Sequence, residues 1–79
     1  MTLVEPQLRL EGVFRTVFAE LQSADVTTVK SFSKTNANGW DSATHLLLLT
    51  CLEEEFGQTI ADAEAGSIDS FAMALAIVC

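Results

Sequence analysis

The sequence predicts an all-α domain with three main helices and one short helix. Hydrophobic residues make up 49% of the chain, which has one proline and four glycines, a composition typical of a folded helical domain. Apolar residues recur at three- and four-residue spacing over residues 10–21, and residues 43–56 lie between helix start and stop signals. The 79 residues are enough for one domain, which we assign to residues 1–79.

The first helix is predicted to follow a frayed segment, residues 1–5. Pro6 suits the first turn, because the N–H that proline lacks would have no helical partner there. Charged residues such as Glu11 and Glu20 are expected on the solvent faces, so we predict a packing helix without chemistry. The apolar stripe consists of Leu10, Val13, Phe14, Val17, Phe18 and Leu21.

Residues 23–38 are predicted to form a long polar connection. Loops of this length are uncommon in compact domains unless they are functional or packed by their own side chains. We therefore expect Val29 or Phe32 to anchor it on the helices. Residues 36–39, Asn-Ala-Asn-Gly, favour turns and bring the chain to the next helix.

The second main helix, residues 43–56, has well-marked ends. Asp41 and Ser42 are both good N-cap residues, and Gly57 suits the left-handed position after the last turn. Ser42 therefore lies at the positive end of a helix dipole, which suits a phosphate group. Trp40 is interpreted either as a hydrophobic staple to this helix or as a contact for partners, and we favour the staple.

Four consecutive leucines in this helix cannot all face the core. The expected buried stripe consists of Phe56, Leu52, Leu49, Leu48 and His45. At least one of Leu46 and Leu47 should be partly exposed among acidic residues, where an apolar side chain suggests a docking surface.

The rest of the chain predicts one helical turn over residues 62–65 and a last helix. Asp69 or Ser67 is expected to cap the last helix, with Phe71, Leu75 and Val78 on one face. Three strong helix formers lie in this helix: Ala72, Ala74 and Ala76. Their small side chains favour close helix packing, although they could also leave space between the helices.

The net charge of −7 is confined to the second half of the chain. Residues 1–34 carry four acidic and four basic side chains, whereas residues 35–79 carry seven acidic side chains and no basic one. Such a field repels nucleic acid and steers encounters with basic protein surfaces. A solvated acidic surface that only aids solubility remains the alternative.

No targeting or metal-binding pattern is present. The chain lacks a basic segment followed by an apolar one, and its apolar runs are too short to cross a bilayer, so we expect a cytoplasmic protein without membrane contact. Cys51 is expected to be a packing residue, and Cys79 could oxidise between chains. Two cysteines, one histidine and scattered carboxylates do not predict a metal centre.

The segment around Ser42 resembles the acyl carrier proteins. That family has Asp-Ser-Leu at the start of its second helix, then an apolar run and Glu-Glu-Glu-Phe. The resemblance continues through Ile60 and Ile68 to Val78 and is less specific over the first 40 residues. The matching residues are Asp41, Ser42, Leu46, Leu48, Leu49, Leu52, Glu53, Glu54, Glu55 and Phe56.

The resemblance implies a four-helix bundle of the acyl-carrier type and a protein that is not an enzyme. It implies that Ser42 carries 4'-phosphopantetheine, whose thiol holds acyl groups as thioesters, and that Asp41 helps to hold Mg²⁺ at the interface with a phosphopantetheinyl transferase. It also implies a monomer that docks on acyl ligases, acyltransferases, ketosynthases or similar enzymes with basic surfaces. The candidate docking residues are Trp40, Ala43, Leu46, Leu47, Thr50, Cys51, Glu53 and Glu54.

The sequence departs from the family at three positions. Ala43 replaces the usual leucine after the serine, Asn38 replaces a leucine before the turn, and Leu47 stands where an acidic residue is common. These departures favour a discrete carrier of polyketide or related secondary metabolism over one of fatty-acid biosynthesis. An aminoacyl or peptidyl carrier is a further alternative, disfavoured because such domains are usually less acidic in this region.

The sequence also suggests two interpretations from other classes. Ser42, His45 and Asp41 could meet at one helix end, but a hydrolase also needs an oriented base, an oxyanion site and a substrate pocket, so we reject it. The other is a helical interaction module that keeps the carrier fold without being modified. The Asp41-Ser42 pair weighs against it, because such a module needs that serine only as a cap.

Overall fold

The computed structural model describes residues 4–78 and consists of helices joined by short loops. Over these residues there is no β-strand, and one isolated bridge joins Ser33 and Ser70. The all-α class is therefore confirmed, whereas the expectation of a single short helix is wrong. The elements are α1 (Val4–Val17), the 3₁₀ helix η1 (Ala19–Leu21), α2 (Val26–Lys30), α3 (Ser42–Phe56), α4 (Asp62–Ser67) and α5 (Phe71–Val78).

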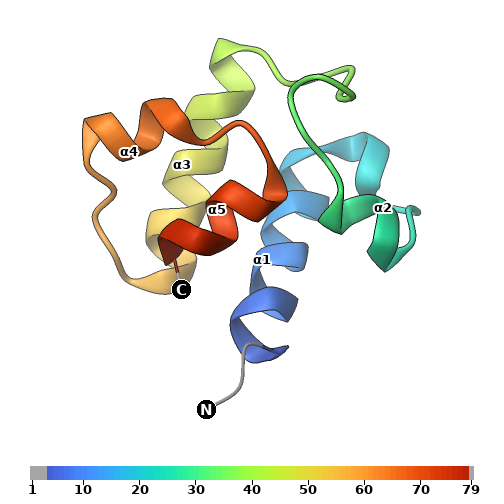
Figure 1. Ribbon diagram of the computed structural model, residues 1–79, viewed down its shortest axis with the longest axis horizontal. Helices are drawn as coiled ribbons and strands as arrows, with labels where there is room; N and C mark the ends of the chain where they lie inside the picture. The colour runs from blue at the N-terminus through green and yellow to red at the C-terminus, as the bar shows by residue number, and fades with distance from the viewer. Residues whose placement is uncertain (1–3, 79) are drawn as a thin grey trace.

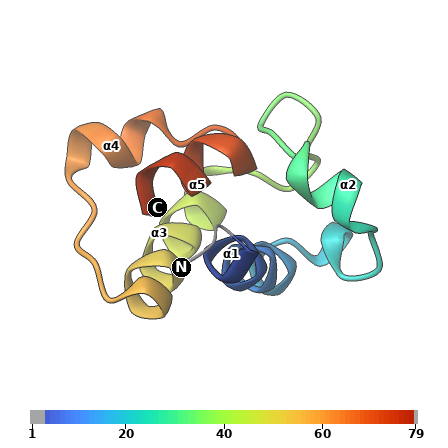
Figure 2. The same ribbon diagram turned by 60° about the horizontal axis from the view of Figure 1, so that its bottom comes forward.

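The three longest helices, α1, α3 and α5, form the centre of the molecule. Helices α1 and α3 lie side by side and run in opposite directions (Figure 1). Helix α5 packs against α1 near α3, and α2 and α4 lie on opposite sides of this group (Figure 2). No helix within residues 4–78 is long and apolar enough to cross a membrane.

The core is one cluster to which every element except α4 contributes a buried side chain. It contains an aromatic group in which Phe14 contacts Phe18, Phe32, Trp40 and Phe71 with ring centroids 5.2–6.3 Å apart. Such edge-to-face and tilted pairs stabilise the fold beyond the area they bury. The buried apolar residues are Leu10, Val13, Phe14, Phe18, Leu21, Val29, Phe32, Leu48, Leu52, Ile60, Ile68, Phe71, Ala74 and Val78.

Helix α1 confirms the predicted apolar stripe, but its first and last residues differ from the predicted ones. It already includes Val4 and Glu5, which were expected to be frayed, and it ends at Val17, so that Phe18 and Leu21 belong to the turn and η1. Residues 1–3 lie outside the described part of the chain. Five of the six stripe residues are buried, and Val17 is half-buried.

The prediction that Glu11 faces solvent is wrong, because its side chain is only 6% exposed. Glu11 lies three residues before Phe14 in α1 and therefore on nearly the same side of the helix, at the edge of the buried stripe. Its carboxylate accepts a hydrogen bond from Gln7 Nε2 at 3.2 Å. The sequence pattern alone assigned this edge position to solvent.

Residues 23–38 are not a structureless connection, because they contain α2. Asp25 caps this helix by accepting a hydrogen bond from Thr28 N–H at 2.8 Å. Val29 and Phe32 are both buried, which confirms the expected anchors. The helix was missed because four of its five residues have β-branched side chains, which have weak helix propensity.

The C-terminal third follows the prediction with small differences. Helix α4 extends to Ser67, two residues beyond the expected turn. Ser70, and not Asp69 or Ser67, caps α5, since its hydroxyl oxygen accepts a hydrogen bond from Met73 N–H at 3.1 Å.

Phe71 and Val78 are buried as expected, and Leu75 is half-buried. Of the three alanines in α5, Ala74 is buried and the other two are exposed. Ala72 and Ala76 therefore do not line an internal space. Cys79 lies outside the described residues.

Candidate functional site

Ser42 is the first residue of α3, and its side chain is exposed. The cap is Asp41, whose carboxylate accepts a hydrogen bond from Thr44 N–H at 2.8 Å. This bond holds the pKa of Asp41 below its ordinary value of 3.8, because it stabilises the charged form. Within residues 4–78 the Ser42 hydroxyl has no hydrogen-bond partner. The possibility that Ser42 itself caps the helix is therefore wrong.

The loop before Ser42 is tied to the segment that precedes α5. Lys34 N–H donates to the carbonyl oxygen of Asp69 at 2.8 Å, and Phe71 N–H donates to that of Phe32 at 2.9 Å. Asn36 braces the loop internally, with its side chain bonded to Ser33 N–H and to the Ser31 carbonyl. The polar turn predicted from the sequence is thus held in one conformation by its own side chains and by a distant segment.

A second tie comes from Glu20, in η1. One of its carboxylate oxygens, Oε1, accepts hydrogen bonds from the N–H groups of Asn38 and Gly39, both at 3.1 Å. The second oxygen lies 3.4 Å from Asn38 N. These bonds join the residues directly before Trp40 to a segment 18 and 19 residues earlier in the chain.

Trp40 is half-buried and packs into the aromatic group of the core. Its ring lies 5.0 Å from that of Phe18 and 5.9 Å from that of Phe32, nearly parallel to the latter. It also stacks on His45. Trp40 precedes the cap and His45 is the fourth residue of α3, which are the two positions that a hydrophobic staple joins. The interpretation of Trp40 as a staple is therefore supported by its contacts.

His45 is engaged through both ring nitrogens. Its Nδ1 accepts a hydrogen bond from Trp40 Nε1–H at 3.0 Å, so Nε2 carries the proton and donates to the Ala65 carbonyl oxygen at 2.9 Å. The imidazole thus joins the start of α3 to α4. Neither nitrogen is directed at Ser42, which agrees with the rejection of a Ser42–His45 nucleophilic pair.

A shallow hollow of about 450 Å³ lies directly beside Ser42. Its apolar wall comes from Trp40 and Leu46, and Lys34 contributes a positive charge. The exposed serine therefore opens onto a surface depression with both apolar and charged walls. The lining residues are Lys34, Trp40, Asp41, Ser42, His45 and Leu46.

The predicted docking residues of α3 lie on one exposed arc of the helix. At about 100° per residue they follow Ser42 around half the circumference. Leu46 and Leu47 are 66% and 50% exposed, so both leucines face solvent. Cys51 and Glu53 are half-buried at the two edges of the arc. The exposed members are Ala43, Leu46, Leu47, Thr50 and Glu54.

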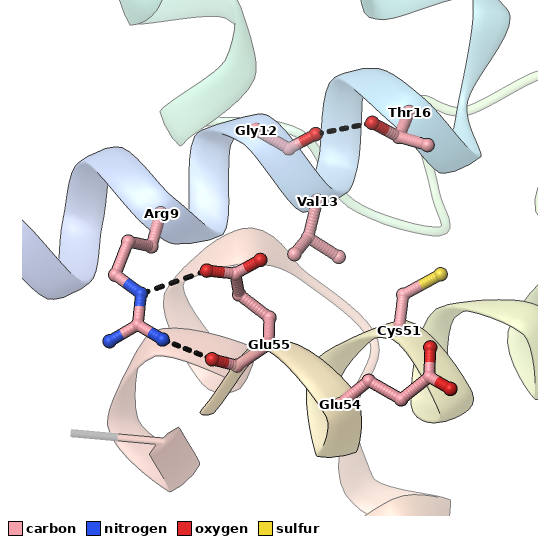
Figure 3. A pocket seen from close by; sticks show the side chains of 7 residues that line it. All are labelled: Arg9, Gly12, Val13, Thr16, Cys51, Glu54 and Glu55. Carbon is pink, nitrogen blue, oxygen red and sulfur yellow. Dashed lines mark hydrogen bonds and ion pairs between the residues drawn. The ribbon is translucent and has the colours of Figure 1, made fainter. Parts of the chain in front are cut away.

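Two of the predicted docking residues also line a groove of about 540 Å³ between α1 and α3 (Figure 3). Cys51 and Glu54 form its α3 side, and Arg9 closes one end by pairing with Glu55 at 2.9 Å. The Arg9 guanidinium also donates to the Glu55 carbonyl oxygen and lies 5.0 Å from the centre of the Phe56 ring. The predicted docking residues therefore border this groove at Cys51 and Glu54.

The Glu53 side chain makes a hydrogen bond within the fold. Its carboxylate accepts a hydrogen bond from Ile60 N–H at 2.8 Å and so fixes the chain that leaves α3. Glu54 is the member of the acidic run that stays exposed without a hydrogen bond to residues 4–78. No cluster of three or more potential metal ligands is found within this part of the chain.

Compared with known proteins, the chain matches no family model, no curated protein and no solved structure.

Sequence reasoning missed two residues of the site, Glu20 and Lys34. Glu20 reaches the loop only because η1 turns the chain back, and no spacing rule connects a carboxylate with amides 18 residues away. Lys34 could have been noticed, since it is the last basic residue before a wholly acidic segment.

Proposed function

We propose that the protein is an acyl carrier whose Ser42 bears a 4'-phosphopantetheine arm. The observation that carries the proposal is an exposed serine hydroxyl at the first position of a 15-residue helix, beside a hollow and uncommitted to any bond within residues 4–78. A transferase has free access to such a hydroxyl. The N–H groups of the first helical turn that Asp41 does not cap favour the phosphate attached there.

The residues around Ser42 fit the attached group. The phosphodiester would lie at the positive end of α3, and Lys34 across the hollow supplies a compensating charge. When bound, the arm supplies a thiol that holds acyl groups as thioesters, so the reactive chemistry belongs to the arm and to partner enzymes. This chain attaches and presents the arm and is not itself the catalyst.

Partner enzymes would recognise the exposed arc of α3. Leu46 and Leu47 supply apolar contact and Glu54 supplies charge, which suits an enzyme surface with basic residues around an apolar depression. Such partners are the phosphopantetheinyl transferase and the acyl ligases, acyltransferases or ketosynthases that load and use the arm. The apolar character of the arc favours a specialised cytoplasmic carrier of polyketide or related secondary metabolism over a general fatty-acid carrier.

The proposal is tested by intact mass spectrometry. The purified protein is incubated with coenzyme A, Mg²⁺ and a broad-specificity phosphopantetheinyl transferase. We expect the mass to rise by one phosphopantetheine, because the serine oxygen displaces adenosine 3',5'-bisphosphate from coenzyme A and loses its proton. The Ser42→Ala variant should gain no mass, whereas the control variant Ser23→Ala, at another exposed serine, should be modified like the parent protein.

A folded protein that gains no mass with this transferase or with a panel of others would contradict the proposal. The exposed Leu46–Leu47 pair would then be explained by an unmodified interaction module that uses the same arc of α3. Loading of a modified protein by an adenylating enzyme specific for amino acids would instead identify an aminoacyl or peptidyl carrier.

A further inference from the structure

We infer that Glu20 is a positioning residue of the modification site, which holds the loop before Ser42 in the conformation that a transferase recognises. The inference rests on the proposed function of Ser42. Glu20 does not contact Ser42 and acts through the backbone of Asn38 and Gly39. It lies in η1, in the half of the chain that resembles carrier proteins least.

The geometry is that of an anion held by consecutive backbone N–H groups. Both Asn38 N–H and Gly39 N–H donate to the same oxygen of Glu20 at 3.1 Å. Two adjacent amides that converge on one point form a small anion-binding concavity. A charged acceptor makes such bonds roughly twice as strong as a neutral one.

The position of these bonds gives Glu20 its influence on Ser42. The loop is fixed at Lys34 by the bond to Asp69, and again at Trp40 by the aromatic group of the core. Between these two points, the bonds to Glu20 are the hydrogen bonds that tie residues 35–39 to a helical element within the described part of the chain. The backbone N–H groups of Asn38 and Gly39, directly before Trp40, are therefore held by one distant carboxylate.

The sequence of the segment explains why it needs a distant tie. Asn38 and Gly39 have little intrinsic conformational preference, because glycine has no Cβ and asparagine tolerates several backbone conformations. Gly39 also lies close to the carboxylate, since a Cβ built at this position would lie 3.7 Å from Glu20 Oε1. Without Glu20 the two N–H groups would bond to water, and the segment would sample more conformations before a transferase bound it.

The first measurement is hydrogen exchange of the Asn38 and Gly39 amides, followed by NMR in the unmodified full chain. We expect Glu20→Ala to accelerate exchange at these two amides about tenfold, since loss of a charge-assisted bond is of this order. Glu20→Gln keeps an acceptor oxygen and should restore part of the protection. The control is Glu64→Ala, which removes an exposed carboxylate of α4.

The second measurement is transfer kinetics with coenzyme A and the same transferase. Glu20→Ala should raise the KM for the carrier about three- to tenfold with little change in kcat, because the loop must be ordered before the hydroxyl is presented. Glu20→Gln should lie between the parent and Glu20→Ala, and Glu64→Ala should match the parent. If Glu20 only stabilised the fold, its variants would have a changed melting temperature. Their KM and kcat, measured at a temperature where every variant is folded, would then match those of the parent.

The outcomes separate this inference from the proposed function. If the parent protein accepts no phosphopantetheine, the proposed function fails, and the exchange experiment alone still reports whether Glu20 holds the loop. If the parent is modified but the Glu20 variants share its exchange rates and KM, Glu20 is not a positioning residue, although the carrier function stands.

Discussion

The two ends of α3 are held by different kinds of contact. At the first end, carboxylates from outside the helix bind backbone N–H groups: Glu20 binds the incoming loop, and Asp41 caps the helix. At the other end, the carboxylates belong to the helix itself. Glu53 binds the departing chain, and Glu55 pairs with Arg9.

The difference shows how one end of a helix can be rigid while its first side chain stays free. The conformation at Ser42 is fixed by backbone bonds and by the packing of Trp40, so the serine hydroxyl has no structural task. At the far end two of the three consecutive glutamates make contacts within the fold, and Glu54 stays exposed without one in residues 4–78. The acidic run of the sequence therefore contains one carboxylate, not three, that is free of such contacts.

The largest effect is expected from Trp40→Ala. The ring contacts three phenylalanines of the core and stacks on His45, so its removal should lower the free energy of unfolding by about 3 kcal/mol. Phe56→Ala, at the other end of α3, removes a half-buried ring and should cost less. Urea denaturation followed by circular dichroism measures both values without relying on tryptophan fluorescence.

The same pair of variants tests the comparison between the ends. At a temperature where both variants are folded, Trp40→Ala should slow phosphopantetheine transfer to Ser42, whereas Phe56→Ala should leave it close to the parent rate. Equal transfer rates for the two variants would show that the Ser42 end does not depend on the packing of Trp40.

A smaller effect is expected from the two aspartate caps. Asp41→Ala and Asp25→Ala each remove a carboxylate that accepts one backbone N–H, and each should lower the free energy of unfolding by less than Trp40→Ala does. Only Asp41→Ala should also slow transfer to Ser42, because Asp25 caps α2. Parallel denaturation and transfer assays distinguish a change at the site from a general loss of stability.

The caps also predict a pH dependence. Hydrogen bonds to Thr44 and Thr28 lower the pKa of Asp41 and Asp25, respectively, below the ordinary value of 3.8. The stabilisation is therefore complete above the unfolded pKa and is lost as the pH falls through the lower, folded pKa. Asp41→Asn retains a cap without this titration, so its stability should fall less than that of the parent in acid. Identical acid profiles for parent and variant would contradict this assignment.

The main helices were predictable because their signals are local. The stripe from Leu10 to Leu21 and the boundaries at Asp41 and Gly57 depend on spacing and on cap chemistry, and Gly57 indeed has a φ of 61°. The exposure of Leu46 and Leu47 follows from the same periodicity. These features need no knowledge of how the helices pack.

The features that the sequence did not reveal depend on contacts between distant segments. Helix α2 has weak intrinsic propensity and is supported by the burial of Val29. The contacts of Glu20 with the loop and of His45 with the Ala65 carbonyl join positions 18 to 20 residues apart. In each case tertiary packing determines the local structure, and the local sequence pattern does not predict that packing.

The smallest effect is expected at the ion pair of Arg9 and Glu55. Both side chains are more than 40% exposed, and exposed pairs contribute little because water and salt screen them. Glu55→Gln should therefore lower the free energy of unfolding by less than about 0.5 kcal/mol. Arg9→Ala should cost more, because the guanidinium also binds the Glu55 carbonyl oxygen and covers the Phe56 ring.

Denaturation of both variants at low and at high salt separates these contributions. The Glu55→Gln difference should vanish in 1 M salt, an ionic strength at which the screening length is about 3 Å, whereas part of the Arg9→Ala difference should remain. Neither variant should alter transfer to Ser42, because the pair lies at the far end of α3. A slowed transfer in either variant would mean that the two ends of the helix are coupled, and the distinction drawn between them would fail.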